Sequence, residues 1–287
     1  MPVSAQEHSF VDAGGVRIVY DVYPAVGAPR AAVQLLHGVG EHAGRYARVA
    51  TVLAEAGFVV YADDHRGHGR TGMGQHGSAA KLGRLGKGGH RAAVAAVWQF
   101  TELIRAEHPD LPLVLIGHSW GSFLAQILVN DHSDAYDAVV LSGSALRWPG
   151  SLNAGDLNAR FTGKDATGVE WLASDLAVGK AFLADPLTTD VPLLRLFGPV
   201  DAARLFGRPR QGLGRDVPLL LMVGRDDPVG GPRSVHRLAD AYRKRSELTD
   251  VTTLVYPGVR HEIFNDVSQD EVFADLLAWL DIRIPRP

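Results

Sequence analysis

The fold is decided by the segment Pro112-Leu-Val-Leu-Ile-Gly-His-Ser-Trp-Gly-Ser-Phe123. It predicts an apolar strand over 112–116, a sharp turn, and an apolar helix from Phe123 onward. Ser119 lies at the turn, where a strained backbone would expose its hydroxyl group. Gly117 and Gly121 flank the serine, and a Cβ at either position would collide with the neighbouring strand or helix. The segment therefore predicts an exposed serine at the end of a buried strand.

Strands and helices alternate on both sides of this segment. Further buried strands are predicted over 32–36, 58–62, 138–141, 218–223 and 251–256. Helical periodicity occupies the intervals at 46–56, 94–104, 235–242 and 272–280, with Ser268 and Glu271 as a capping box before the last. A hairpin is predicted over 10–23. Near-continuous apolar strands are typical of a mostly parallel sheet covered by helices on both faces, so the fold class is α/β.

Two stretches interrupt this alternation. Residues 67–89 are rich in glycine and predict a long loop. Residues 146–214 show no strand pattern and form too long a stretch for a connecting loop. We interpret them as a helical cap inserted over the strand ends, which leaves a core made of residues 1–145 and 215–287.

Composition excludes several classes of protein. The 287 residues are 46% hydrophobic and 21% charged, which is ordinary for a globular protein and excludes disorder. Lys and Arg total 29 against 32 Asp and Glu, so there is no basic excess for nucleic acid. The chain has no cysteine, which excludes disulfides and thiolate chemistry. No secretion signal precedes the first strand, and no apolar run approaches the ~18 residues of a membrane span, so we expect a cytoplasmic protein.

A serine needs a base to become a nucleophile, and the base needs an acid to orient it. Three histidines follow Ser119 in the sequence. His132 and His236 fall within predicted helices and are expected at the surface. His261 falls in a loop just past the strand 251–256, so it is the candidate base.

The candidate acid lies in the loop after the strand 218–223, where Asp226 and Asp227 compete. Backbone N–H groups that stabilise a developing oxyanion are expected from two loops. One is the N–H of Trp120, directly after the serine. The other is the N–H of Val39, in the loop after the strand 32–36.

At this point the chain resembles the α/β-hydrolase fold, and within it the monoacylglycerol lipase and lysophospholipase-like group with a serine aminopeptidase-type domain. The resemblance covers about residues 10–145 and 215–285. It rests on the blocks His37–His42 with Arg45-Tyr46, Asp64–Gly69, Gly117–Gly121, Asp185–Leu187 and Tyr256–Asn265. It implies that the acid is Asp227, the third residue after Gly224, and that Glu41 and Arg45 brace the oxyanion loop near the polar end of the substrate.

The resemblance also implies the reaction. We expect hydrolysis of a small ester or lipid through an acyl-enzyme on Ser119, without metal or organic cofactor. Three alternatives share the site: an aminopeptidase similar to the proline iminopeptidases, with Asp156, Glu170, Asp175 or Asp190 binding the substrate amine; an acyltransferase; and a ligand receptor without turnover. Acyl length, headgroup and oligomeric state are left open by the sequence.

Two further features admit more than one interpretation. The apolar side of residues 193–206, with Leu194 and Phe197, either packs the cap onto the core, or lines an acyl channel or touches lipid. The block His65-Arg66-Gly67-His68-Gly69 offers two histidines, but no third ligand accompanies them, so we interpret it as a structural turn and not as a metal site. Ser122 and Trp120 stand where relatives commonly have glycine and methionine, which alters the floor of the pocket.

Overall fold

The computed structural model describes residues 3–153 and 155–286. Its strands are β1 (Gln6–Val11), β2 (Arg17–Tyr23), β3 (Ala31–Leu36), β4 (Phe58–Asp63), β5 (Leu113–His118), β6 (Ala138–Ser142), β7 (Leu219–Gly224) and β8 (Val251–Tyr256). They form one eight-stranded sheet in the order β1-β2-β4-β3-β5-β6-β7-β8. β2 pairs antiparallel with β1 and with β4, and all other pairs are parallel. The predicted α/β class, the hairpin and each predicted strand are confirmed, the strands within two residues of their predicted ends.

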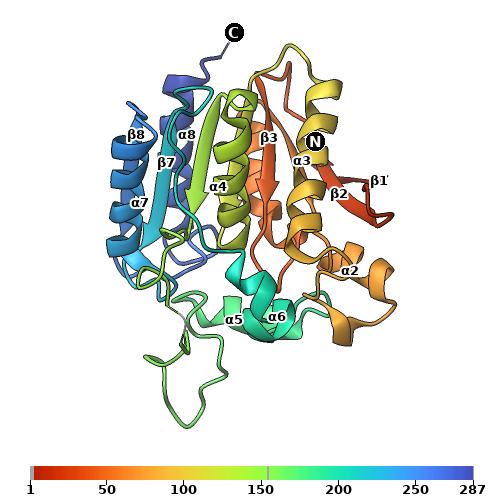
Figure 1. Cartoon of the computed structure of the whole chain (residues 1–287), viewed down its shortest axis with the longest axis vertical. Coiled ribbons are helices and arrows are strands. Elements are labelled where there is room, and N and C mark those ends of the chain that lie inside the picture. The colour runs from red at the N-terminus through yellow and green to blue at the C-terminus, as the bar shows by residue number, and fades with distance from the viewer. Residues whose placement is uncertain (1–2, 154, 287) are drawn as a thin grey trace.

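Helices cover both faces of this sheet, as Figure 1 shows. The long helices are α1 (Ala47–Glu55), α3 (Gly89–Glu107), α4 (Trp120–His132), α7 (Gly231–Arg245) and α8 (Gln269–Arg283). Apolar side chains of α3, α4 and α7 pack on one face, and those of α1 and α8 on the other. Because parallel strands bury both faces, β3 to β7 carry almost no exposed residue.

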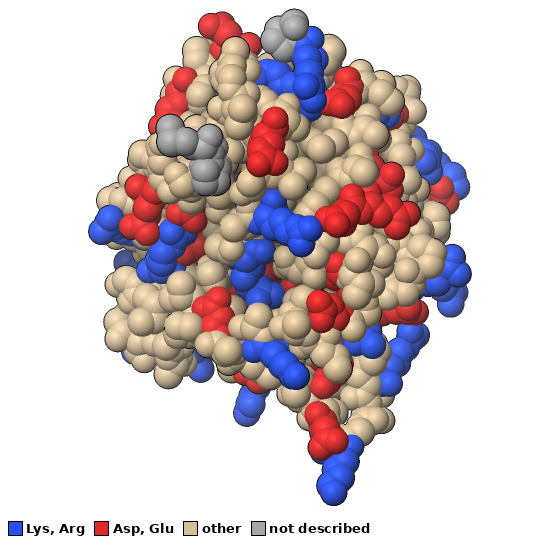
Figure 2. Space-filling model, turned by 180° about the vertical axis from the view of Figure 1, so that it is seen from behind, with Lys and Arg blue, Asp and Glu red and all other residues tan. Residues whose placement is uncertain are grey.

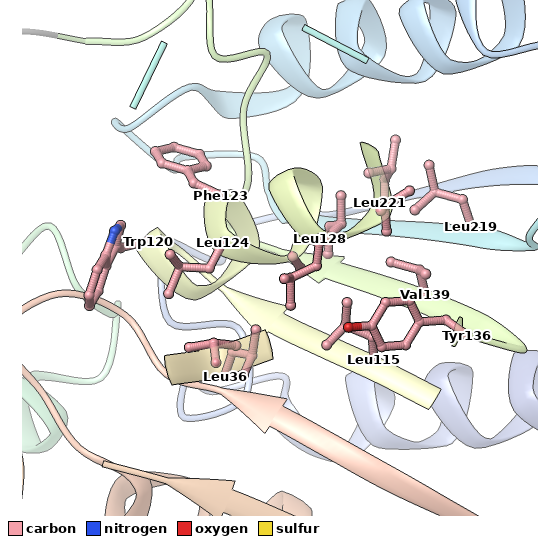
Figure 3. Close-up of a cluster of buried hydrophobic side chains, with 14 of the residues drawn as sticks. Leu36, Leu115, Trp120, Phe123, Leu124, Leu128, Tyr136, Val139, Leu219 and Leu221 are labelled. Carbon is pink, nitrogen blue, oxygen red and sulfur yellow. The ribbon is translucent and has the colours of Figure 1, made fainter. Parts of the chain in front are cut away.

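The helix that follows the candidate serine is anchored by the core. In Figure 3, Leu124 and Leu128 of α4 point toward Leu36 of β3 and Leu115 of β5. All four side chains are at most 1% exposed, so α4 and the strand ends form one rigid unit. This packing fixes the start of α4, where the candidate serine lies.

The long loop predicted over 67–89 is wrong. This stretch contains the helix α2 (Gly69–His76) and a short 3-10 turn, Ala79–Lys81. Several of its glycines mark close packing: an added Cβ at Gly69 would lie 2.5 Å from the carboxylate of Asp64, and one at Gly72 would lie 2.3 Å from a backbone oxygen. Glycine enrichment here reflects crowding and not flexibility.

One local expectation also fails. The side chain of Ser268 makes no capping hydrogen bond at the start of α8, because its backbone is near φ −96° and ψ 18° and not extended. His132 is partly exposed, and its ring stacks on that of Trp98, which is also partly exposed, with 3.6 Å between the ring centres. His236, in contrast, is exposed, as predicted.

The segment between β6 and β7 crosses the carboxyl ends of the strands. It contains α5 (Leu176–Ala184) and α6 (Leu193–Ala203), which lie below the sheet in Figure 1. Leu196, Phe197 and Leu205 belong to the main core cluster, so the apolar side of this segment does pack on the core. The helix α6 is kinked at Gly198, where φ is 73° before Pro199.

The face of the molecule opposite to the view of Figure 1 has, among the described residues, no large patch of only acidic or only basic side chains (Figure 2). Figure 2 shows acidic and basic side chains interspersed there among uncharged residues. Within the described ranges, every helix is too short or too polar to traverse a lipid bilayer.

Candidate active site

Ser119 occupies a strained turn between β5 and α4. Its backbone has φ 52° and ψ −121°, a conformation that costs about 1–3 kcal/mol and persists where the surroundings impose it. An added Cβ at Gly117 would lie 2.6 Å from the carbonyl oxygen of Gly121, and one at Gly121 would lie 2.3 Å from that of Leu36. The two glycines therefore let β5, α4 and β3 approach closely enough to force the turn. Ser119 is half-buried while both its neighbours are buried.

The loop after β8 brings His261 to the same end of the sheet. Its ring lies 4.7 Å from the ring of His118, the residue before Ser119. Nδ1 of His261 lies 3.0 Å from Oδ2 of Asp227. Nε2 of His261 is buried and has no hydrogen-bond partner among the described residues. Because Nδ1 binds the carboxylate, Nε2 is the nitrogen left to accept a proton.

The two aspartates after β7 differ in their surroundings. Asp227 is 5% exposed, and its second oxygen accepts the N–H of Val229 at 2.8 Å. Asp226 is more exposed, and only its backbone N–H is engaged, with the carbonyl of Val259 at 3.0 Å. At Gly224 an added Cβ would lie 2.0 Å from the carbonyl oxygen of Arg260, so the acid loop and the histidine loop are in direct contact.

Opposing effects set the pKa of His261. Burial lowers it, and the carboxylates of Asp227, Glu262 and Glu41 raise it, with a net pKa above the ordinary 6.5. Burial holds the pKa of the neighbouring His118 well below that value. The site therefore contains one imidazole that can become charged, and its charge is stabilised by the carboxylate behind it.

The loop after β3 lies against the serine. An added Cβ at Gly38 would lie 3.0 Å from Cβ of Ser119. Among the described residues, the backbone N–H groups of Val39 and Trp120 donate no hydrogen bond. The structure thus leaves free the two donors that the sequence singles out.

A buried ionic network supports this loop. Oε1 of Glu41 accepts the N–H of Gly38 and the hydroxyl of Tyr46, both at 2.7 Å. Arg45 lies between Glu41, at 3.2 Å, and Glu262, at 2.5 Å. Burial and the nearby Glu262 raise the pKa of Glu41, against the effect of Arg45. Because Glu262 follows His261, the network joins the Val39 loop to the His261 loop.

Residues 27–268 match the sequence model of a family described as serine aminopeptidase, S33. The chain belongs to this family. It is 36% identical to a monoacylglycerol lipase of Mycolicibacterium smegmatis, over 96% of each chain, and 26% identical to a mouse monoglyceride lipase, over 96% of this chain and 90% of the relative.

A solved structure agrees. The chain superposes on a thermostable carboxyl esterase of Bacillus coagulans, solved in complex with glycerol, with a TM-score of 0.79 and 26% identity, over 98% of this chain and 99% of the esterase. The family model, the relatives and the solved structure agree on one class of enzyme. This S33-family chain is an ester-hydrolysing serine hydrolase of the α/β-hydrolase fold.

In this S33-family chain the segment between β6 and β7 is hydrogen-bonded to the loop that carries His261, a feature that sequence reasoning missed. The Arg260 guanidinium donates to the carbonyls of Glu170 and Ala173, at 2.7 and 2.9 Å. The fully buried carboxylate of Asp266 accepts the N–H groups of Ser174, at 2.9 Å, and of Arg260, at 2.8 Å. These partners are about ninety residues apart in sequence, and no local pattern signals them.

The same segment also contributes aromatic contacts. The ring of Trp171 lies 5.1 Å from that of His261. Phe197 is 9% exposed and its ring lies 5.1 Å from that of Trp120. Leu194, predicted together with Phe197, is 61% exposed instead. The buried side of α6 is Leu193, Leu196 and Phe197, in the i, i+3, i+4 spacing, which turns Leu194 outward.

The two histidines of the 65–69 block bind neighbouring residues, one a side chain and the other the backbone. Nδ1 of His65 binds Asp63 at 2.7 Å, and Nδ1 of His68 binds the carbonyl of Arg66 at 2.9 Å. In the described part of the chain, no group of three or more histidines and carboxylates is arranged to hold a metal ion.

Of two cavities in the structure, one lies near Arg45 and the other lies away from the candidate residues. One of about 310 Å³ is lined by Arg45, Asp185 and Asn265, beneath α5. A larger one of about 500 Å³ is lined by Asn130, Arg208 and Arg245, at the far ends of α4 and α7, and contains none of the candidate residues.

Proposed function

We propose that this chain hydrolyses carboxylic esters of the monoacylglycerol or lysophospholipid-like kind through an acyl-enzyme on Ser119, with His261 as base and Asp227 as acid. One observation carries the proposal. The buried imidazole of His261 has Nδ1 on Asp227 at 3.0 Å and leaves Nε2 unpartnered among the described residues. This is the state of a base that awaits a proton.

The reaction follows from this arrangement. Ser119 Oγ attacks the ester carbonyl carbon while its proton passes to Nε2 of His261. The tetrahedral intermediate collapses when His261 gives that proton to the leaving alcohol oxygen. Water then attacks the acyl-enzyme, again with His261 as base, and releases the carboxylic acid. Asp227 fixes the tautomer of His261 and stabilises its charged form.

The N–H groups of Val39 and Trp120 hold the oxyanion. Support comes from their lack of other acceptors among the described residues and from the contact of the Gly38 backbone with Ser119. The carboxylate of Glu41 orients the donor loop from below. Preorganised donors of this kind contribute about 3 kcal/mol each to the transition state.

Glu41 and Arg45 have different roles toward the substrate. Both oxygens of Glu41 are occupied, by Gly38 and Tyr46 on one side and Arg45 on the other, so Glu41 braces the loop and does not bind the headgroup. Arg45 lines the cavity of about 310 Å³. It is the residue through which a polar alcohol group would be bound.

The cap, residues 146–214, supplies the apolar part of the substrate site and a lipid contact. Phe197 lines the substrate side, against Trp120. Leu194, at 61% exposure, and Val200, at 64%, face outward on α6, and Leu176, at 60%, does so on α5. Exposed apolar side chains gathered on one segment are typical of a surface that touches lipid.

The aminopeptidase alternative lacks support in the cap. Glu170 accepts hydrogen bonds from Asn158 and Thr167, and Asp175 caps α5. Asp156 and Asp190 are exposed. Among the described residues, these four carboxylates are committed elsewhere or solvated, and they form no common site for a substrate amine.

The decisive experiment combines turnover with active-site labelling. Purified chain is incubated with a monoacylglycerol, a lysophospholipid and an aminoacyl-arylamide, and with a fluorophosphonate probe. We expect ester hydrolysis and labelling by the wild type, and loss of both in Ser119→Ala. Labelling that survives in Ser119→Ala, or arylamide cleavage without ester hydrolysis, would overturn the proposal. Product analysis with added alcohol separates hydrolysis from acyl transfer.

A further inference from the structure

We infer that the indole of Trp120 closes the acyl side of the site and restricts this enzyme to esters of short acyl chains. The inference rests on the proposed function, in which the N–H of Trp120 binds the oxyanion. It concerns the side chain of that residue, which the reaction itself does not use.

The position of the base sets the direction of the acyl chain. The leaving oxygen must face Nε2 of His261 to receive its proton, so the acyl chain extends away from His261. The surroundings of His261 are His118, Asp227 and Trp171. None of them is among the rings that contact Trp120. Trp120 directly follows Ser119 and has a separate set of ring neighbours from His261, so we place the indole on the acyl side of Ser119.

The indole is enclosed on several sides. Its ring lies 5.5 Å from His65, 5.1 Å from His68 and 6.2 Å from His90. The ring of Phe197, in cap helix α6, lies 5.1 Å away in an edge-on arrangement. Trp120 is 1% exposed, and in Figure 3 it projects beyond the end of α4, away from Leu124 and Leu128. A rigid ring enclosed in this way cannot swing aside for a long chain unless α6 moves.

Trp120 also packs within the main core cluster, where a large apolar side chain would serve equally well. Nε1 of Trp120 is buried with no hydrogen-bond partner in the described part of the chain, and such an orphaned donor is destabilising. Buried tryptophans usually have a partner for this N–H. Trp279, on the opposite face of the sheet, has one, since its Nε1 donates to Thr252 at 3.2 Å. A large apolar side chain at position 120 would keep this packing without the unsatisfied donor, so what the indole adds at this position is its size and shape.

The test is a chain-length profile. Acetyl, butanoyl, octanoyl and palmitoyl esters of one alcohol are compared for the wild type, Trp120→Phe and Trp120→Met. Methionine is flexible and leaves room that tryptophan fills. Trp279→Met is the matched control, because it makes the same change at a buried position outside the site.

We expect the wild type to prefer acetyl and butanoyl esters. In Trp120→Met the ratio of kcat/KM for palmitoyl to that for butanoyl esters should rise at least about tenfold, with a smaller rise in Trp120→Phe and none in Trp279→Met. If the Trp120 variants fold poorly, Phe197→Leu provides a second test. It replaces the opposing ring by a smaller side chain and should shift the profile in the same direction. A wild type that favours palmitoyl esters, or an unchanged ratio in the variants, overturns the inference. Absence of hydrolysis of every ester would instead contradict the proposed function.

Discussion

Asp227 reaches the imidazole of His261 at 3.0 Å, and its neighbour Asp226 has no contact with that ring among the described residues. The difference follows from the turn after β7, in which the backbone N–H of Asp226 binds the carbonyl of Val259. In this turn Asp226 is partly exposed, whereas Asp227 is buried against the histidine.

This geometry predicts unequal effects of two conservative substitutions. Asp227→Asn should lower kcat for ester hydrolysis by about 10³–10⁴-fold, because an amide no longer holds the productive tautomer or stabilises the charged imidazole. Asp226→Asn should change kcat less than about threefold. Steady-state kinetics on a dissolved ester measures both. A larger loss in Asp226→Asn would mean that the acid has been misassigned.

The pH dependence of turnover should report the same pair. Only neutral His261 accepts the serine proton, so kcat/KM should fall at acidic pH, with a midpoint above the ordinary histidine value of 6.5. Asp227→Asn removes the main group that raises this pKa, and burial then lowers it. The acidic limb of the residual activity should therefore move to lower pH. A midpoint that stays in place would show that another group titrates.

Steric crowding at the serine turn makes a prediction about stability. Gly121→Ala places a Cβ 2.3 Å from the carbonyl oxygen of Leu36, so we expect a loss of several kcal/mol of unfolding free energy, roughly the upper range of single substitutions. Gly74→Ala, in the exposed part of α2, meets no atom within 4 Å and should stabilise the chain by about 0.5–1 kcal/mol. Urea unfolding compares the two. Similar values for both would argue against close packing at the turn.

The carboxylate of Asp266 should matter for both stability and turnover. Asp266→Asn replaces an acceptor of backbone N–H groups by an amide donor, so we expect a loss of about 1–3 kcal/mol of unfolding free energy and a lower kcat as the His261 loop loosens. Asp270→Asn serves as control, because that side chain is 84% exposed. Urea unfolding and steady-state kinetics compare the two variants. The same unfolding free energy and the same kcat in both would contradict the role of Asp266.

Outward-facing apolar residues of the cap predict a difference between dissolved and membrane-bound substrate. Leu194→Asp should lower hydrolysis of a butanoyl ester of a long-chain alcohol embedded in phospholipid vesicles, relative to hydrolysis of a butanoyl ester that is dissolved in water. Val11→Asp changes a similarly exposed side chain, at 61%, on the strand β1. Vesicle co-sedimentation and the ratio of the two rates test the contact. An equal ratio of vesicle rate to solution rate in the two variants would contradict the lipid contact.

Local sequence was sufficient for the parts of the site that depend on local geometry. The turn at Ser119 follows from two glycines and a strand that lie within a few residues of it, and the position of His261 follows from the strand before it. Asp227 was separated from Asp226 only through resemblance, because the bond that distinguishes them involves Val259, in another loop.

Contacts between distant segments were beyond the reach of sequence patterns. The bonds from Arg260 and Asp266 to the cap join positions about ninety residues apart. The helix α2 was missed for a different reason, since its glycines resemble those of a flexible loop until Asp64 and the Gly67 carbonyl are seen beside them. The exposure of Leu194 depended on which side of α6 meets the core.

The bonds between residues 170–175 and the loop that carries His261 limit how this protein can be re-engineered. Segments that determine selectivity are attractive units for transplantation between homologues. Here a donor segment that lacks partners for Arg260 and Asp266 would leave a half-buried guanidinium and a buried carboxylate unsatisfied next to His261. A functional chimera would therefore have to exchange residues 170–175 and the loop that carries His261 together.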